Sequence, residues 1–199
     1  MEVLTVVAIL GILAALLLPV LGRTQQNAKK AKTRVQFSQW SSAIEAFRQE
    51  YGHYPAFHTV GNAAYIENGL IDNATKTNAF VQTLSGTTLA GARYENADPG
   101  FVAGNAKRIR FYTFGDADLT KASSPLLQDG FGNTAIVVLM DKNYDGQIRF
   151  GSATTDDYSS PPSVGGFSLA STAPIRAGVA FYSAGAGNSA GDVVTSWAP

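Results

Sequence analysis

The hydrophobic pattern divides the chain into two unequal parts, and the first is an uninterrupted apolar run. Residues 3–21 contain no charged side chain. At helical rise these nineteen residues span roughly 28 Å, close to the thickness of a bilayer's hydrocarbon layer. Because the run is apolar on every side, it predicts a membrane-spanning helix rather than a core helix. A cleaved signal peptide is the alternative, although only Met1 and Glu2 precede the run where a basic segment would be expected.

After the apolar run, hydrophobic residues recur at intervals of three and four, which predicts that the same helix continues as an amphipathic one. The expected apolar stripe consists of Ala28, Ala31, Val35, Phe37, Trp40, Ile44, Phe47 and Tyr51. Gly52 and Pro55 stop the pattern. One long helix is therefore expected from about residue 3 to about residue 51.

Basic residues cluster directly after the apolar run. Between residues 22 and 54 there are six basic and two acidic groups. Positive charge beside a membrane span favours the cytoplasmic side, which conflicts with an exported C-terminal part unless a more basic segment precedes Met1. The alternative is a solvated helix face next to lipid headgroups.

From residue 56 onward, the pattern predicts shorter elements. A short helix is expected near residues 78–84, and residues 159–166 read as a loop. Strands rich in β-branched and aromatic residues are expected at 109–114, 135–140, 147–150 and 177–182. The predicted fold class is α+β: residues 1–55 form the long helix, and residues 56–199 form a domain whose small antiparallel sheet packs on the amphipathic half of that helix.

Composition removes several functional classes. The chain has 15 basic and 15 acidic residues, two histidines and no cysteine, so it has no disulfides, no thiolate metal site and no cysteine nucleophile. Phosphate-binding and Gly-x-Ser-x-Gly motifs are absent from the sequence. We therefore expect no enzymatic activity. No nucleic-acid binding is predicted, because zero net charge argues against it and a strand with one charged face accounts for Arg108 and Arg110.

The clearest chemical motif is the segment from Asp141 to Ile148, with the sequence DKNYDGQI. Oxygen-bearing side chains at its first, third and fifth positions, Gly at the sixth and a backbone carbonyl at the seventh match the opening of a calcium loop. The expected ligands are Asp141, Asn143, Asp145 and the carbonyl of Gln147. Ser152 occupies the twelfth position, where a Glu belongs, so water, Asp156 or Asp157 would complete the site. A hairpin turn that binds no metal is the alternative.

The N-terminal segment MEVLTVVAILGILAALLLPVLGRTQQNAKK resembles the signature of type IV pilins and type II secretion pseudopilins. Glu2, Gly11 and Pro19 fall at the spacing typical of that superfamily and are the expected assembly residues. A carboxylate in the first helical turn is favoured by the helix dipole, and in a filament it could pair with a neighbour's N-terminal amine. Gly11 and Pro19 weaken the helix between them. The family pattern also predicts a basic leader and a Phe-Thr-Leu run before Met1.

The resemblance implies a structural subunit of a type IV pilus-like or type II secretion pseudopilus filament. Its implied partners are further copies of the chain, the inner membrane before assembly, a prepilin peptidase that cleaves and methylates the N-terminus, and the assembly machinery. The filament would be periplasmic or extracellular. The alternative function is a monomeric calcium-binding module that a single membrane span tethers outside the cytoplasm.

Two further segments are similar to those of major pseudopilins. Residues 128–133 (QDGFGN) resemble the turn before their sheet, and residues 181–197 resemble their closing segment, where a calcium site orders the loop. Asp192 is the only carboxylate of that closing segment, and it is the candidate ligand of a second calcium site. A glycine-rich loop closed by burial of Trp197 is the alternative.

Overall fold

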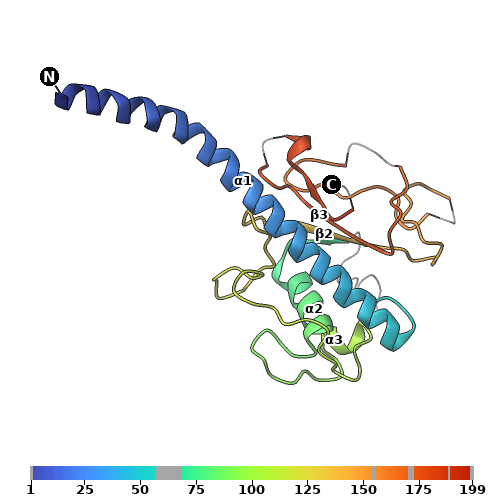
Figure 1. The fold of residues 1–199 in the computed structure, drawn as a ribbon. Coiled ribbons are helices and arrows are strands. Elements are labelled where there is room, and N and C mark those ends of the chain that lie inside the picture. The colour runs from blue at the N-terminus through green and yellow to red at the C-terminus, as the bar shows by residue number, and fades with distance from the viewer. Residues whose placement is uncertain (1, 57–68, 154–155, 170–172, 188, 198–199) are drawn as a thin grey trace.

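A computed structural model describes residues 2–56, 69–153, 156–169, 173–187 and 189–197. One continuous helix, α1 (Glu2–Tyr51), opens the chain. Its first half projects away from the rest of the molecule, whereas its second half packs against the domain (Figure 1). The helix ends at Gly52, which has φ 78° and donates its N–H to the carbonyl of Arg48 at 2.8 Å. The expected long helix is confirmed.

The domain contains a small antiparallel sheet of four strands in the order β1–β2–β3–β4. The strands are β1 (Leu70–Ile71), β2 (Ile136–Met140), β3 (Val179–Ser183) and β4 (Val194–Thr195). Three short helical elements accompany them: α2 (Ala74–Ser85), α3 (Pro99–Val102) and the 3-10 helix η1 (Ala190–Asp192). The α+β class, with a long N-terminal helix and a small antiparallel sheet, is therefore confirmed.

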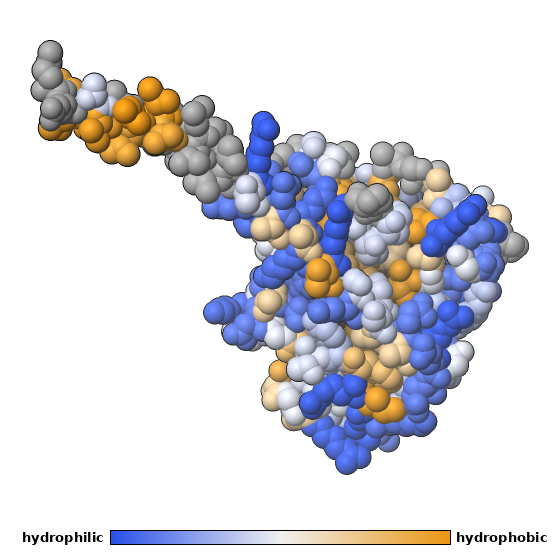
Figure 2. Space-filling view, in the orientation of Figure 1, coloured by the Kyte–Doolittle hydropathy of each residue, from blue (hydrophilic) through white to orange (hydrophobic). Residues whose placement is uncertain are grey.

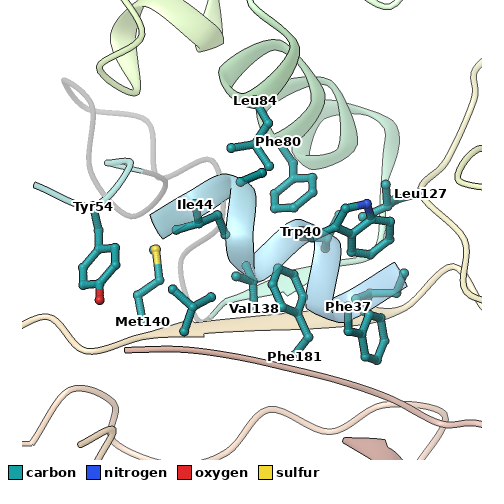
Figure 3. Packing of buried hydrophobic residues seen from close by; sticks show 14 of the residues in the cluster. Phe37, Trp40, Ile44, Tyr54, Phe80, Leu84, Leu127, Val138, Met140 and Phe181 are labelled. Carbon is teal, nitrogen blue, oxygen red and sulfur yellow. The ribbon is translucent and has the colours of Figure 1, made fainter. Parts of the chain in front are cut away.

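Both faces of the sheet are covered. Phe37, Trp40 and Ile44 of α1 are fully buried and meet Val138 and Phe181 of the sheet. Figure 3 shows these α1 side chains between the sheet and α2, which contributes Phe80 and Leu84. The alternate residues of the two central strands turn to the opposite face, where the segments between residues 148 and 175 cover them. Every residue of β2 and β3 is consequently buried.

The predicted apolar stripe of the helix is wrong in its first third. Val35 is 58% exposed, and Ala28 and Ala31 are exposed as well, whereas Phe37 is fully buried. Residues 35 and 37 are two positions apart, which places them on opposite sides of a helix. The buried stripe therefore begins at Thr33, Gln36 and Phe37, and Ala28, Ala31 and Val35 belong to another face.

Two of the four predicted strands are wrong. Residues 109–114 form no strand, because the N–H groups of Phe111 and Tyr112 both donate to the carbonyl of Leu84 at the end of α2. Residues 147–150 contribute only isolated bridges, at Ile148 and Phe150. The other two predictions correspond to β2 and β3, and the predicted helix at 78–84 lies within α2.

Candidate functional site

Eight of the ten large hydrophobic side chains that stand exposed among the described residues lie on the projecting half of α1. Its exposed aliphatic side chains, here called the apolar stretch, range from 51% exposed at Leu13 to 76% exposed at Val3. They are Val3, Leu4, Val6, Val7, Ile9, Leu10, Ile12 and Leu13. Figure 2 shows this end of the helix as hydrophobic, while the same view of the domain is mostly hydrophilic. A contiguous apolar surface of this kind marks a site of interaction.

The expected assembly residues all lie along this helix. Glu2, Gly11 and Pro19 are helical in the backbone, and the helix is continuous through all three. For Glu2 and Pro19 the structure describes the backbone and not the side chain. A methyl group at Gly11 would meet nothing within 4 Å, so no contact within the chain requires glycine there. Among the described residues, no helix is both long enough and apolar enough to cross a membrane.

The turn at residues 128–133 fastens α1 to the sheet. Asp129 is 2% exposed, and its carboxylate accepts hydrogen bonds from the N–H groups of Phe131 and Asn133 and from the Ser183 hydroxyl at 2.6 Å. The next residue, Gly130, donates its N–H to the Thr33 hydroxyl at 3.0 Å. The turn therefore holds the helix where it leaves the domain, a role that its sequence alone did not reveal.

The predicted calcium ligands at residues 141–147 do converge in one loop. The Asp141 carboxylate accepts the N–H groups of Asp145 at 3.2 Å and Gly146 at 2.7 Å. Asn143 Oδ1 accepts the same Asp145 N–H at 3.0 Å, and Asp145 Oδ1 accepts the N–H of Gln147 at 2.9 Å. A carboxylate or amide oxygen has two lone pairs, so an oxygen of this type can accept a hydrogen bond and also bind a cation. The oxygen set therefore suits a hard cation such as calcium.

Basic groups next to the loop compete with a cation. Arg149 lies 3.1 Å from Asp145 Oδ2 and is paired with it. Asp157 is buried and accepts the N–H groups of Lys142 at 2.7 Å and Arg149 at 2.9 Å, so it pins both ends of the loop. No cluster of three or more His, Asp or Glu side chains suited to a metal occurs in the described part of the chain. The loop offers two carboxylates, an amide and a carbonyl as ligands. Calcium binding here stays a prediction.

Asp192 does not join this loop. It ends η1 two residues before Val194, which pairs with Ser183 at one end of β3. Asp141 follows Met140, which pairs with the other end of β3. The strand between these ends spans roughly 14 Å, whereas calcium binds oxygens at about 2.3–2.6 Å. One cation cannot bind both carboxylates, so a second calcium site at Asp192 stays a separate prediction.

A cluster at the end of α1 was not expected from the sequence. The Arg48 guanidinium lies 4.8 Å from the ring centre of Tyr54 and 5.1 Å from that of Tyr144, and the two rings stack at 5.6 Å. Tyr54 donates its hydroxyl to Glu45 at 3.0 Å. Burial, and then the Glu45 carboxylate, raise the pKa of Tyr54 to about 12. Because Tyr144 belongs to the 141–147 loop, the cluster ties that loop to α1.

Comparison of the chain with protein-family models, curated proteins and solved structures gives no significant match. The likeness to pilins therefore rests on the N-terminal segment with Glu2, Gly11 and Pro19 and on residues 128–133 and 181–197, and membership of that superfamily stays a prediction.

Proposed function

We propose that this chain is a structural subunit of a type IV pilus-like or type II secretion pseudopilus filament. The observation that carries the proposal is the apolar stretch, whose side chains are all more than half exposed on a helix that projects from a mostly polar domain. In this proposal the helices of many copies form the core of the filament, and the domains cover its outside. The chain itself carries out no covalent chemistry in this proposal.

The size of the apolar stretch favours many neighbours over one. Full burial of a Val, Leu or Ile side chain contributes about 1.5–3 kcal/mol, so eight partly exposed ones offer on the order of 10 kcal/mol. Association itself costs about 4–15 kcal/mol. A single neighbour covers only one side of a helix and recovers part of that energy. Contact on several sides, as in a filament core, makes assembly favourable.

The domain surface is consistent with a coat. Beyond the apolar stretch, the large hydrophobic side chains that stand exposed among the described residues are Val35 and Tyr144. On the face that Figure 2 shows, the surface of the domain is mostly hydrophilic. Such a domain stays in water while its helix is buried among others. In this proposal, neighbouring copies cover the apolar stretch, and the assembly as a whole faces water through its domains.

The same proposal implies how the subunit is processed and assembled. Before assembly the precursor is held in the inner membrane, where a prepilin peptidase removes a leader and methylates the new N-terminus. The assembly machinery then transfers the subunit into a periplasmic or extracellular filament, where the Glu2 carboxylate pairs with the N-terminal amine of a neighbour. That pairing spares both groups the cost of unpaired burial, which is several kcal/mol for each.

The alternative function is a calcium-binding module that acts as a tethered monomer, and the converging oxygens of residues 141–147 are what favours it. Replacing Glu2 discriminates the two. Glu2→Ala should remove the chain from the sheared cell-surface fraction, whereas Glu95→Ala, at an exposed position of the domain, should not. A tethered monomer would be indifferent to both substitutions. Equal behaviour of the two variants, together with a wild-type chain that enters neither sheared nor membrane-attached filaments, would favour the tethered module.

A further inference from the structure

The strand β4 forms one edge of the described sheet, because it comes last in the order β1–β2–β3–β4. Ser196, directly after β4, donates its N–H to the carbonyl of Phe181 in β3 at 2.9 Å. In an antiparallel pair, such bonded positions alternate with positions whose N–H and C=O point away from the partner strand. Thr195 occupies a position of the second kind, opposite Tyr182. Its backbone donor and acceptor therefore point outward from the edge of the sheet.

A groove of about 460 Å³ lies beside this edge. Val194 packs into the core between the sheet and α1, so the alternate residues Thr195 and Trp197 face the other side of the sheet. The Trp197 ring stands at 88° to the ring of Tyr182, with 6.0 Å between the ring centres, which fixes its orientation. The residues that line the groove are mostly apolar, and they include Leu169, Pro174, Ile175, Arg176, Thr195 and Trp197.

Arg176 places an uncompensated positive charge in the groove. Its side chain is exposed, and it forms no ion pair with any residue that the structure describes. Of the described residues, none that lines the groove carries a carboxylate. A guanidinium binds a carboxylate through two parallel hydrogen bonds, so the missing partner is an acidic group.

We propose that the β4 edge and this groove bind an extended acidic peptide segment of another protein. The segment adds a strand beside β4, and its backbone bonds to the N–H and C=O of Thr195. Side chains two positions apart on an extended segment face the same side. An apolar one fills the groove beside Trp197, and an acidic one pairs with Arg176. This binding goes beyond the proposed function and does not depend on it, because a single copy of the chain carries the whole site.

The three features of the site favour the same kind of partner. A sheet edge is completed by another extended chain, whereas a helix has its backbone groups bonded internally and would leave Thr195 without a partner. The apolar lining favours a hydrophobic side chain over a bare anion. Arg176 favours an acidic neighbour over a basic one. Because β4 has only two residues, the backbone bonds are few and the side-chain contacts have to contribute to affinity.

Tryptophan fluorescence of the full-length chain in detergent micelles measures this binding. The chain has two tryptophans, and Trp40 is fully buried whereas Trp197 lines the groove. The probe is the peptide acetyl-Thr-Leu-Thr-Glu-Thr-amide, which places Leu and Glu two positions apart. It should change the emission and saturate below about 1 mM. A fully N-methylated version of the peptide cannot donate to the edge and should leave the emission unchanged.

Paired substitutions test the charge contact. Arg176→Gln should weaken binding of the probe by about fivefold, as expected for a partly exposed ion pair. The control is Arg93→Gln, at an exposed position between α2 and α3, which should leave binding unchanged. A peptide with Gln in place of Glu should bind the wild-type chain as weakly as the Arg176→Gln variant binds the probe. The two changes together should cause no further loss, because each removes the same contact.

Four results would overturn the inference. The first is an emission that stays constant up to about 1 mM probe. The second is equal binding of the N-methylated peptide, which would show that the β4 edge is not used. The third is additive losses from Arg176→Gln and the Gln peptide, which would show that the two charges do not meet. The fourth is an unchanged response in Trp197→Phe, which would place the peptide elsewhere. None of these results bears on filament formation, so the proposed function stands or falls separately.

Discussion

The guanidinium of Arg48, near the end of α1, lies 5.1 Å from the ring centre of Tyr144 in the loop that follows β2. Tyr144 also stacks on Tyr54 and has φ 63°, a left-handed conformation that is costly for a tyrosine. The contacts of its ring with Arg48 and Tyr54 offset that cost and hold the 141–147 loop against α1.

Tyr144→Ala should therefore lower the free energy of unfolding by about 1–2 kcal/mol, from the lost cation–π and stacking contacts. Urea unfolding of the full chain measures this. Tyr144→Phe keeps the ring and loses only the hydroxyl that accepts the Tyr54 N–H at 3.3 Å, so it should cost much less. Equal losses for Ala and Phe would show that the ring contacts contribute nothing.

Gly130 lies where the 128–133 turn meets α1, and its missing side chain matters there. A methyl group on Gly130 would lie 2.8 Å from both the Lys29 carbonyl oxygen and the Thr33 hydroxyl. Gly130→Ala should lower the free energy of unfolding by about 1–3 kcal/mol through this overlap. Gly115→Ala, where a methyl group meets nothing within 4 Å, serves as the control and should change it by less than about 0.5 kcal/mol. Similar losses in both variants would contradict the contact.

Calcium at the 141–147 loop should stabilise the folded chain. With a dissociation constant of about 0.1–1 mM, which is usual for extracellular modules, 10 mM calcium adds roughly 1–3 kcal/mol and raises the melting temperature by several degrees. A calcium titration of thermal unfolding measures the shift. Asp145→Ala should abolish it, because Asp145 Oδ1 is a predicted ligand oxygen that faces the loop.

The matched control for calcium is Asp192→Ala, which lies at the other end of β3 and should leave the shift at the 141–147 loop intact. If wild-type chain shows no shift at 10 mM calcium, the loop is a turn that binds no metal. If only Asp192→Ala removes the shift, the closing segment holds the cation instead.

Buried and partly buried tyrosines predict a loss of stability at high pH. Burial is the main cause that raises the pKa of Tyr54, Tyr94 and Tyr112 to about 12 from the ordinary 10. Because folding favours the neutral phenols, their contribution is complete below pH 10 and is lost as the pH rises from 10 to about 12. Tyrosinate absorbance and circular dichroism should change together in that interval. Full ionisation of all tyrosines near pH 10 with the fold retained would contradict this.

Elements with a strong period were predictable from the sequence. An uncharged run followed by bulky residues such as Trp40 and Phe47 predicts the helix from Glu2 to Tyr51, and a run of four aliphatic residues and a methionine predicts β2. The convergence of Asp141, Asn143 and Asp145 was also predictable, because alternate positions of a tight loop turn the same way. In each case the determining interactions are local in sequence.

Features that depend on distant partners were not predictable. Phe111 and Tyr112 have strand-forming side chains, but their N–H groups meet the carbonyl of Leu84 instead of a neighbouring strand. The short strands β1 and β4 exist only because they pair with the ends of β2 and β3. Likewise, the residues around Arg48 in the sequence do not predict its contact with Tyr144, which lies far along the chain.

The most direct test of the central claim is electron microscopy of filaments sheared from native cells, with mass spectrometry of the same fraction. The filament proposal predicts thin filaments in which this chain is the main component, lost when Glu2 is replaced by Ala. A chain that stays in the inner membrane as a monomer and never enters a filament, sheared or membrane-attached, would contradict it.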